Sequence, residues 1–394
     1  MKICMLVHQN YYVDQRVIRY AESLVEQGHT VDVVCARERE QVRRTRVNGS
    51  IRVTPILIPH GNSANAIEFI LEYGLAFVCY FLVLSWLYLF RRYDVVHVHN
   101  MPDFLVFSAL IPRIFGAKVI LDIHDPVPEF YQSKFRAKED STLVQLLQLE
   151  ERCSIWFANA VICANENFRD NIIERGTEPE KITVIRNFPD RKVYNREKFA
   201  AFKNDNLQKF VLVYPGTIAP RYGLDIAIRA IDIVKNSYPA IELRIIGPEN
   251  AYKQALRELV ASLRLGRWVN ILPAVSMEEV PAALVNADAG IYPAFPDAHM
   301  DIAIPTKVLE FTIMGLPVIA SRLKVIDQLF KNGKAFLFAA GDVDEFAKVI
   351  QQCLADRNQL REAVTINDAN LLPEWQWDLE KAKYFSLLQH LFQR

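Results

Sequence analysis

A short segment near residue 310 combines residue types that suit the binding of a nucleoside diphosphate. Pro305 and Gly315 predict a helix between them, with Thr306 as its N-cap. The free N–H groups and the dipole at the start of such a helix attract a diphosphate, and Lys307 adds a full positive charge. Glu310, one turn further along, is placed to accept hydrogen bonds from two ribose hydroxyls. Taken alone, the segment also fits an ordinary capped helix with a solvated Lys–Glu pair.

A second segment follows another predicted strand. Gly216 lets a phosphate or a sugar approach the backbone closely, with Thr217 next to it. Arg221, in the following turn, can form bidentate hydrogen bonds to a diphosphate. If the turn binds nothing, Arg221 is an ordinary solvated loop residue.

Histidines stand at the ends of two predicted strands in the N-terminal half. His99 and Asn100 come at the end of strand 94–99, and His124 follows strand 118–123. Ligands of open parallel sheets bind beyond the carboxyl ends of the strands, so we expect His124 to face a ligand. The alternative is a buried structural network in which nearby carboxylates hold this histidine.

Two patterns are similar to metal-binding motifs. His97 and His99 share one face of their strand, but no third ligand follows at a spacing typical of a metal-binding motif. Asp342 and Asp344 stand directly before a predicted helix, where acidic residues cap the helix and match its dipole. The sequence therefore predicts no metal site.

Alternating strands and helices carry all of these segments. Strands are predicted at 2–7, 31–35, 53–58, 94–99, 118–123, 160–163 and 182–185, and again at 210–214, 241–246, 269–272, 289–292 and 317–320. The intervening helices include 14–27, 105–115, 143–157, 165–175, 223–235, 251–263, 277–286 and 307–314. The pattern predicts an α/β protein with two parallel, doubly wound sheets. We divide the chain into a first domain at 1–188, a linker at 189–208, a second domain at 209–372 and a final helix at 373–394 that packs back on the first domain.

Composition narrows the class of protein. The chain has 394 residues, 51% of them hydrophobic, which is enough for two cores. Lys plus Arg and Asp plus Glu number 46 each, so no overall field draws the chain to nucleic acid. The six cysteines form no Cys-x-x-Cys, which argues against a disulfide framework or a zinc site and favours a cytoplasmic location.

The stretch from Gly74 to Phe90 is apolar apart from Ser85. It is slightly shorter than the roughly 20 residues that a membrane-spanning helix needs. Arginines flank it on both sides, at 37, 39, 43, 44 and 46 and at 91 and 92. The stretch therefore predicts either a helix in a membrane interface or a helix buried inside the first domain.

Together these segments resemble the retaining GT-B glycosyltransferases of family 4 type, the group 1 glycosyltransferases, which include sucrose synthases and mannosyltransferases of lipid-linked glycans. The resemblance rests on Pro305-Thr-Lys through Glu310, on Gly315-Leu-Pro-Val-Ile-Ala and on similar blocks at 94–100, 121–129 and 214–223, and it covers nearly the whole chain. It implies a GT-B fold, in which two Rossmann-like domains with parallel sheets face a cleft. It also implies a UDP- or GDP-sugar donor and no cofactor.

The resemblance implies roles for the candidate residues. The expected catalytic residues are His124, Arg221 and Lys307. The expected donor-site residues are Gly216, Thr217, Thr306 and Glu310. His124 would orient the donor sugar, and the two cations would neutralise the leaving diphosphate. The implied mechanism is a metal-independent front-face attack, in which the departing phosphate deprotonates the acceptor hydroxyl.

On the acceptor side, the resemblance points to Asp14, Arg16, His99 and Asn100. Asp14 and Arg16 fit the capping of the following helix equally well. The expected acceptor is a glycan or a lipid-linked glycan, which is consistent with an interfacial helix at 74–90 and with a place on the inner face of the plasma membrane. Surface polysaccharide or glycolipid assembly is the expected pathway.

Two departures from the family pattern bear on activity. The family has a second glutamate eight positions before the one that matches Glu310, and here Ile302 takes that place beside Asp301. Related subgroups with a Pro-Ser/Thr-Lys motif lack it too, so we expect an active enzyme. The family also has a lysine where Tyr222 stands.

Two other functions fit parts of this pattern. A non-catalytic, nucleotide-sugar-binding partner of another transferase is favoured by the missing glutamate alone. A sugar-nucleotide epimerase would share the fold and the donor site. A phosphorylase would need a pyridoxal-bearing lysine, for which the sequence gives no signal.

Overall fold

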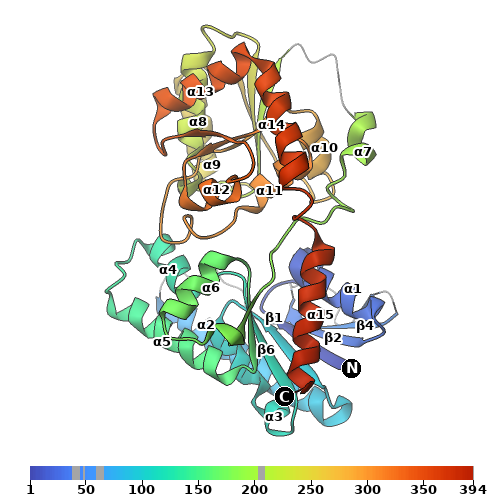
Figure 1. The fold of residues 1–394 in the computed structure, drawn as a ribbon. Coiled ribbons are helices and arrows are strands. Elements are labelled where there is room, and N and C mark those ends of the chain that lie inside the picture. The colour runs from blue at the N-terminus through green and yellow to red at the C-terminus, as the bar shows by residue number, and fades with distance from the viewer. Residues whose placement is uncertain (38–44, 48, 59–65, 203–208, 394) are drawn as a thin grey trace. The chain divides into compact units, whose positions relative to one another are not determined.

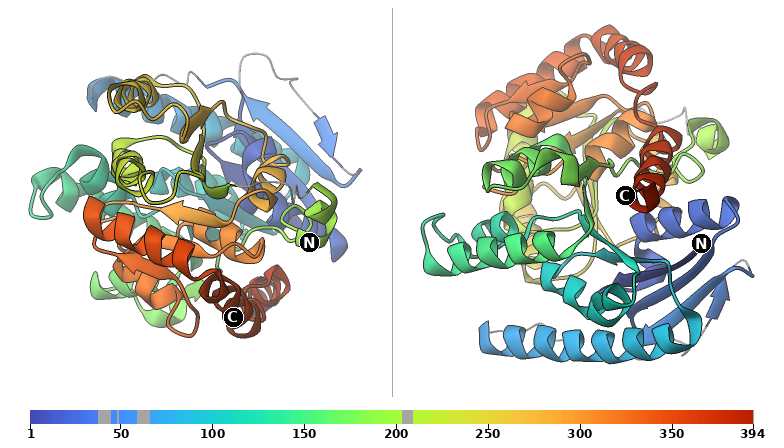
Figure 2. Two further views of the ribbon diagram at one scale, coloured as in Figure 1. Left: turned by 90° about the horizontal axis from the view of Figure 1, so that it is seen from above. Right: turned by 60° about the horizontal axis from the view of Figure 1, so that its bottom comes forward.

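The computed structural model describes residues 1–37, 45–47, 49–58, 66–202 and 209–393 (Figure 1). The chain divides into two compact units. The first unit comprises Met1–Asn187 and Asp378–Arg394, and the second comprises Phe188–Trp377. Each unit has a parallel sheet with helices on both faces (Figure 2).

The sheet of the first unit has the strand order β3-β4-β2-β1-β5-β6-β7-β8. Its strands are β1 (Lys2–Val7), β2 (Thr30–Ala36), β3 (Thr45–Val47), β4 (Ile51–Ile56), β5 (Val95–His99), β6 (Lys118–Ile123), β7 (Ala160–Cys163) and β8 (Ile182–Val184). All are parallel except β3, a short edge strand that pairs antiparallel with β4 and that the sequence did not predict. Central strands such as β1 are buried from Ile3 to Val7, because helices cover both faces.

The helices of the first unit connect these strands. They are η1 (Tyr11–Val13), α1 (Gln15–Glu26), α2 (Ala66–Arg91), η2 (Asp103–Ala109), α3 (Leu110–Ile114), α4 (Val127–Phe135), α5 (Thr142–Phe157), α6 (Glu166–Glu174), η3 (Pro179–Lys181) and α15 (Trp377–Gln393). The predicted single helix at 105–115 is a 3-10 turn, η2, followed by α3. Pro112 falls in the first turn of α3, where its missing N–H is not needed.

The sheet of the second unit has the order β11-β10-β9-β12-β13-β14. Its strands are β9 (Phe210–Pro215), β10 (Ile241–Ile246), β11 (Val269–Leu272), β12 (Ala289–Tyr292), β13 (Val318–Ser321) and β14 (Phe336–Phe338). The order reverses between β9 and β12, where a doubly wound sheet binds its ligand. Residues 188–202 belong to this unit, because Tyr194 and Phe199 lie in its core. The remainder of the predicted linker, 203–208, is outside the described residues.

The helices of the second unit include three elements that position the candidate site. They are α8 (Leu224–Val234), α9 (Ala251–Ser262) and α11 (Thr306–Ile313). The others are α7 (Arg196–Phe199), η4 (Ala200–Phe202), η5 (Pro220–Tyr222), α10 (Val280–Val285), α12 (Lys324–Leu329), α13 (Val343–Ala355) and α14 (Arg357–Asn370). Phe311 of α11 packs on Gly290 of β12, where any Cβ atom would lie 2.3 Å from the ring. This contact fixes α11 against the centre of the sheet.

Candidate donor site and buried histidine cluster

Helix α11 begins one residue earlier than predicted. Its N-cap is Pro305, with no side-chain capping bond, so the prediction of Thr306 as the cap is wrong. Pro305 already has the extended backbone that a cap requires, with φ −75° and ψ 116°, and Thr306 is therefore the first helical residue, with an exposed side chain. Gly315, with φ +74°, ends the helix as predicted.

A cavity of about 350 Å³ lies at the start of α11. Five predicted residues from two distant segments line it: Gly216, Thr217, Thr306, Lys307 and Glu310. Tyr194 and Gly247 also line it. The structure thus brings together the two sequence segments that were expected to hold a nucleoside diphosphate, and we refer to this as the donor cavity.

Two glycines shape the wall of the donor cavity. Gly216 has φ +117°, and a Cβ atom there would lie 2.4 Å from Cε of Lys307. Gly247 follows the neighbouring strand, and its Cβ atom would lie 2.2 Å from the Gly216 carbonyl oxygen. The backbones at the ends of β9 and β10 can therefore come close to each other and leave room for the Lys307 side chain.

Lys307 is a cation without a counterion in direct contact. Its Nζ lies 5.4 Å from the ring centroid of Tyr214 and 5.0 Å from that of Tyr222. Within the described part of the chain, no group forms a hydrogen bond or an ion pair with it. Burial lowers the pKa of Lys307, and the Glu310 charge opposes that shift. Tyr222, which replaces the family lysine, therefore supports Lys307 through its ring.

Glu310 lies on the same cavity wall with a different set of partners. Burial raises the pKa of its carboxyl group, while Lys307 and a hydrogen bond from the Tyr194 hydroxyl partly offset that rise. The sequence analysis missed Tyr194, which falls in the predicted linker. Its position before a polar stretch gave no signal that it would enter the core.

Arg221 does not line the donor cavity. Its Nη2 lies 3.5 Å from Oδ2 of Asp297 and 3.2 Å from Nδ1 of His299, two residues that the sequence analysis did not identify. Its Nε is buried and has no partner among the described residues. Arg221 therefore keeps one donor free while Asp297 balances its charge.

Asp301 and Ile302 occupy the region where the family has its second glutamate. Ile302 is buried, with 7% of its surface exposed. The Asp301 carboxylate accepts a hydrogen bond from the backbone N–H of Lys324 at 3.4 Å. Asp301 thus lies against the start of α12 and does not line the donor cavity.

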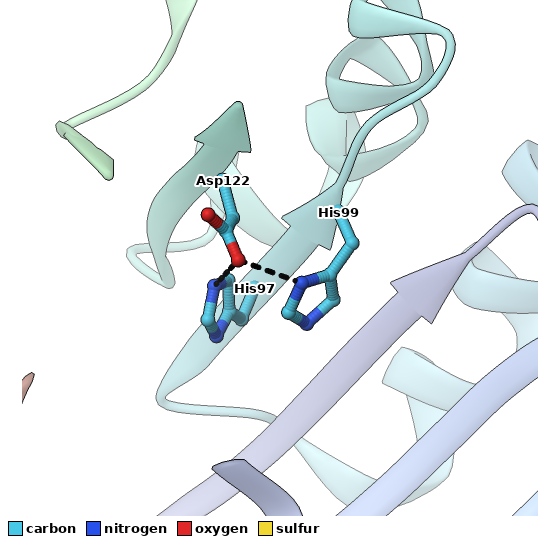
Figure 3. Close-up of side chains that lie close together, drawn as sticks. All are labelled: His97, His99 and Asp122. Carbon is cyan, nitrogen blue, oxygen red and sulfur yellow. Dashed lines mark hydrogen bonds and ion pairs between the residues drawn. The ribbon is translucent and has the colours of Figure 1, made fainter. Parts of the chain in front are cut away.

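In the first unit, Asp122 is the centre of a buried cluster (Figure 3). Arg16 donates two hydrogen bonds to its carboxylate, from Nε and Nη2, both at 2.8 Å. His99 donates a third from Nδ1 at 3.0 Å. The His97 ring nitrogen Nε2 lies 3.9 Å from the same carboxylate. We call these four residues the Asp122 cluster.

Charges within the Asp122 cluster are balanced. Burial alone would raise the pKa of Asp122, but Arg16 and His99 hold it well below its ordinary value. Burial lowers the pKa of both His97 and His99, so the histidines stay neutral around the Arg16–Asp122 ion pair. Nδ1 of His97 lies 3.0 Å from the Tyr384 hydroxyl of α15, which ties the C-terminal helix to the cluster.

Three residues of the Asp122 cluster are of types that bind metal ions. Ligand atoms of His97, His99 and Asp122 all lie within 4.8 Å of one another. Arg16, however, already binds both carboxylate oxygens, and its positive charge would repel a divalent cation at that distance. The arrangement is that of a hydrogen-bonded network. Asp342, in the second pattern, caps α13 by accepting a hydrogen bond from the Glu345 N–H at 2.9 Å, as predicted.

The other predicted residues of the first unit, Asp14, Asn100 and His124, differ in the hydrogen bonds that their side chains form. Asp14 caps α1, because its carboxylate accepts from the N–H groups of Arg16 and Val17 at 3.1 Å. The Asn100 side chain donates to Asp103 and Asp125 and accepts from the His124 N–H, so it ties the loops after β5 and β6 together. The Nε2 atom of His124 is buried and has no partner among the described residues.

Comparisons with known proteins agree with this geometry. A model of the glycosyl transferase 4-like domain matches residues 13–187, and a model of the glycosyl transferases group 1 matches residues 195–370. A chitobiosyldiphosphodolichol beta-mannosyltransferase of Candida albicans is 24% identical over 69% of this chain and 63% of its own length. A GDP-mannose-dependent phosphatidylinositol monomannoside mannosyltransferase of Mycolicibacterium smegmatis is 26% identical over 51% of this chain and 52% of its own length. The chain thus spans between half and two thirds of these two relatives.

Solved structures show the fold. Sucrose-phosphate synthase from Thermosynechococcus elongatus superposes with a TM-score of 0.79, at 16% identity, over 100% of this chain and 99% of that chain. The Anabaena protein HepE, solved in complex with UDP, gives 0.72 at 16% identity over 99% and 100%. These matches confirm the predicted fold class, two Rossmann-like α/β units of GT-B type. With the two family models covering both units, the chain belongs to the group 1 glycosyltransferases.

Proposed function

We propose that this chain transfers a sugar from a nucleotide-diphosphate donor to a hydroxyl of a glycan or lipid-linked acceptor. The observation that carries the proposal is Lys307, a half-buried cation with no anion in direct contact, at the start of α11 and beside the close-packed Gly216 backbone. A diphosphate supplies the missing negative charge. Glu310, on the same wall, accepts hydrogen bonds from the ribose.

The proposed chemistry relies on positioning and on charge. Lys307 and the free N–H groups of α11 bind the leaving diphosphate. His124 orients the donor sugar through its unused ring nitrogen. The departing phosphate removes the proton of the acceptor hydroxyl, so the step needs neither an enzyme base nor a metal ion.

The stereochemical outcome is a separate part of the proposal. The two relatives in sequence are named as mannosyltransferases, the first as a beta-mannosyltransferase and the second as an alpha-(1-6)-mannosyltransferase that depends on GDP-mannose. We propose retention, with GDP-mannose as the first donor to test and UDP-sugars as the second. The anomeric configuration of the product, read by NMR, decides between retention and inversion.

The donor site can be tested before any acceptor is known. Thermal unfolding is measured with UDP, GDP, ADP and CMP on the wild type, on Glu310→Gln and on Glu258→Gln, an exposed residue of α9 that serves as the control. A nucleotide at a hundred times its Kd stabilises the wild type and the control by about 2.7 kcal/mol. Glu310→Gln, with binding weakened about tenfold, should lose about half of that gain. No shift with any nucleotide would contradict the proposed donor site.

A non-catalytic binding partner is the second candidate, and the buried Ile302 favours it. Both candidates predict nucleotide binding. They separate in a donor-hydrolysis assay, because an active transferase slowly transfers its sugar to water. Binding of a nucleotide sugar without any hydrolysis or transfer would favour the non-catalytic partner.

A further inference from the structure

Three helices on one face of the first unit's sheet expose large apolar side chains. Helices α2, α3 and α5 all lie in successive parallel crossovers from β4 to β7, which places them on the same side of the sheet. Helix η2, which continues into α3, packs against both α2 and α5. Six side chains, each more than half exposed, define what we call the three-helix face: Leu82, Trp86, Phe90, Ile114, Leu146 and Trp156.

Helix α2 is apolar on both of its sides. Tyr80 and Leu84 face inward, and the Tyr80 hydroxyl donates to the Val7 carbonyl at 2.8 Å. Leu82 and Trp86 face outward and are 60% and 63% exposed. By length and composition, Tyr73–Arg91 is a candidate membrane span, with a mean hydropathy of 1.9. The inner side of α2 is held to the end of β1 by the Tyr80 hydrogen bond, so the helix lies along the first unit (Figure 2, right).

Helix α5 has apolar side chains on both of its sides. Its buried side carries Val144, Ile155 and Phe157 together with Glu151, which forms an ion pair with Arg175 at 2.7 Å. Its outward side carries Leu146 and Trp156, the latter 74% exposed. A surface helix of a water-soluble unit normally carries charged and polar side chains on its outward side. The large apolar side chains on the outward side of α5 therefore suit an apolar surrounding.

Arginines lie between the helices of the three-helix face. Arg92 lies over the rings of Tyr88 and Phe115, between α2 and α3, and Arg113 lies over the ring of Phe157, between α3 and α5. Arg152 is exposed on α5. Of the arginines that precede α2 in the sequence, Arg39, Arg43 and Arg44 are outside the described residues.

We propose that the three-helix face docks on an anionic lipid surface. Its exposed tryptophans suit the boundary between headgroups and acyl chains, and its arginines attract anionic headgroups. A second copy of the same face would bring the same arginines opposite one another, which disfavours a symmetric dimer. Docking is independent of the donor site, and it brings the first unit to the surface where a lipid-linked acceptor would lie.

Flotation with vesicles tests the proposal on the full chain. The wild type should float at low salt with phosphatidylcholine vesicles that contain phosphatidylglycerol, and more weakly at high salt. The double variant Leu82→Gln/Trp86→Gln should bind at least about tenfold more weakly. Arg92→Gln and Arg152→Gln should each weaken binding about fivefold on these vesicles alone and not on pure phosphatidylcholine.

A matched control separates docking from folding. Phe202→Gln/Leu379→Gln replaces an exposed aromatic and an exposed leucine outside the three-helix face and should float like the wild type. Quenching by brominated lipids provides a direct readout, because it should reach Trp86 and Trp156 and should fall when both are replaced by phenylalanine. A wild type that stays in solution with anionic vesicles would overturn the proposal. So would light scattering that shows a dimer abolished by Leu82→Gln/Trp86→Gln without any vesicle binding.

Discussion

The donor cavity and the Asp122 cluster both gather polar residues near the carboxyl ends of parallel strands, yet they differ in how far those residues satisfy one another. In the cluster, Asp122 accepts three hydrogen bonds, two from Arg16 and one from His99. In the cavity, Lys307 has two tyrosine rings and no hydrogen-bonded anion among the described residues. The first arrangement holds a backbone in place, whereas the second leaves a charge for a ligand to neutralise.

Breaking the Asp122 cluster should produce the largest effect, and the effect should be on stability. Asp122→Asn leaves the Arg16 guanidinium buried without a counter-charge, which should lower the free energy of unfolding of the first unit by about 3–5 kcal/mol. Chemical denaturation, with hydrogen exchange on peptides from α1 and β6, measures this. The control Asp170→Asn breaks an exposed pair with Arg169 and should cost less than about 1 kcal/mol. A cost below that of the control would mean that the cluster is not structural.

Removing Lys307 should have the opposite signature, with a large effect on activity and a small one on stability. Lys307→Met should lower kcat/KM by about 10²–10³-fold, because the leaving diphosphate loses its cation. The melting temperature should stay close to that of the wild type, since Nζ has no hydrogen bond to lose. Lys348→Met, at an exposed position of α13, is the matched control. Full activity in Lys307→Met would remove Lys307 from the proposed mechanism.

Much of the fold could be predicted because burial on both faces leaves a clear pattern in the sequence. The bounds of β1, β6, β7, β10, β11 and β12 agree with prediction to the residue. The edge strand β3 and the short β14 were missed. The three residues of β3 include an arginine and show no apolar run, and β14 has three residues and is only partly buried.

The candidate site was only partly predictable. Local patterns in the sequence identified three of its residues. Gly216 lies in a predicted turn, Lys307 at a predicted helix start, and Glu310 one helical turn after it. The partner of Arg16 is Asp122, which lies 106 residues away, so no local pattern could identify that pair. The same holds for Tyr194 beside Glu310 and for Asp297 beside Arg221. Which polar atoms remain free depends on such distant partners, and only the structure shows them.

Lowering the pH is expected to reduce the free energy of unfolding through the Asp122 cluster, by less than the substitutions above change stability or activity. Burial lowers the pKa of His97 and His99 in the folded protein, while an unfolded histidine titrates near pH 6.5. Below that pH the unfolded chain binds more protons, so the free energy of unfolding falls as the pH falls, by up to about 1.4 kcal/mol per pH unit for each histidine. His97→Gln should flatten this slope between pH 7 and pH 5, and His390→Gln, at an exposed position of α15, should not. Equal slopes in all three proteins would show that the buried histidines do not carry the effect.

The smallest expected effect concerns Glu310. Glu310→Gln keeps one oxygen acceptor but loses the charge that strengthens hydrogen bonds to ribose hydroxyls, so the donor KM should rise about tenfold while kcat changes little. A donor with a 2′-deoxyribose tests the contact itself, because it removes one of the two hydroxyls. The wild type should lose affinity for the deoxy donor, and Glu310→Gln should lose much less, since the two changes remove the same interaction. If the two losses simply add, Glu310 contacts some other part of the donor, and the pairing of a ribose-binding carboxylate with a diphosphate-binding lysine on one wall of the cavity would have to be given up.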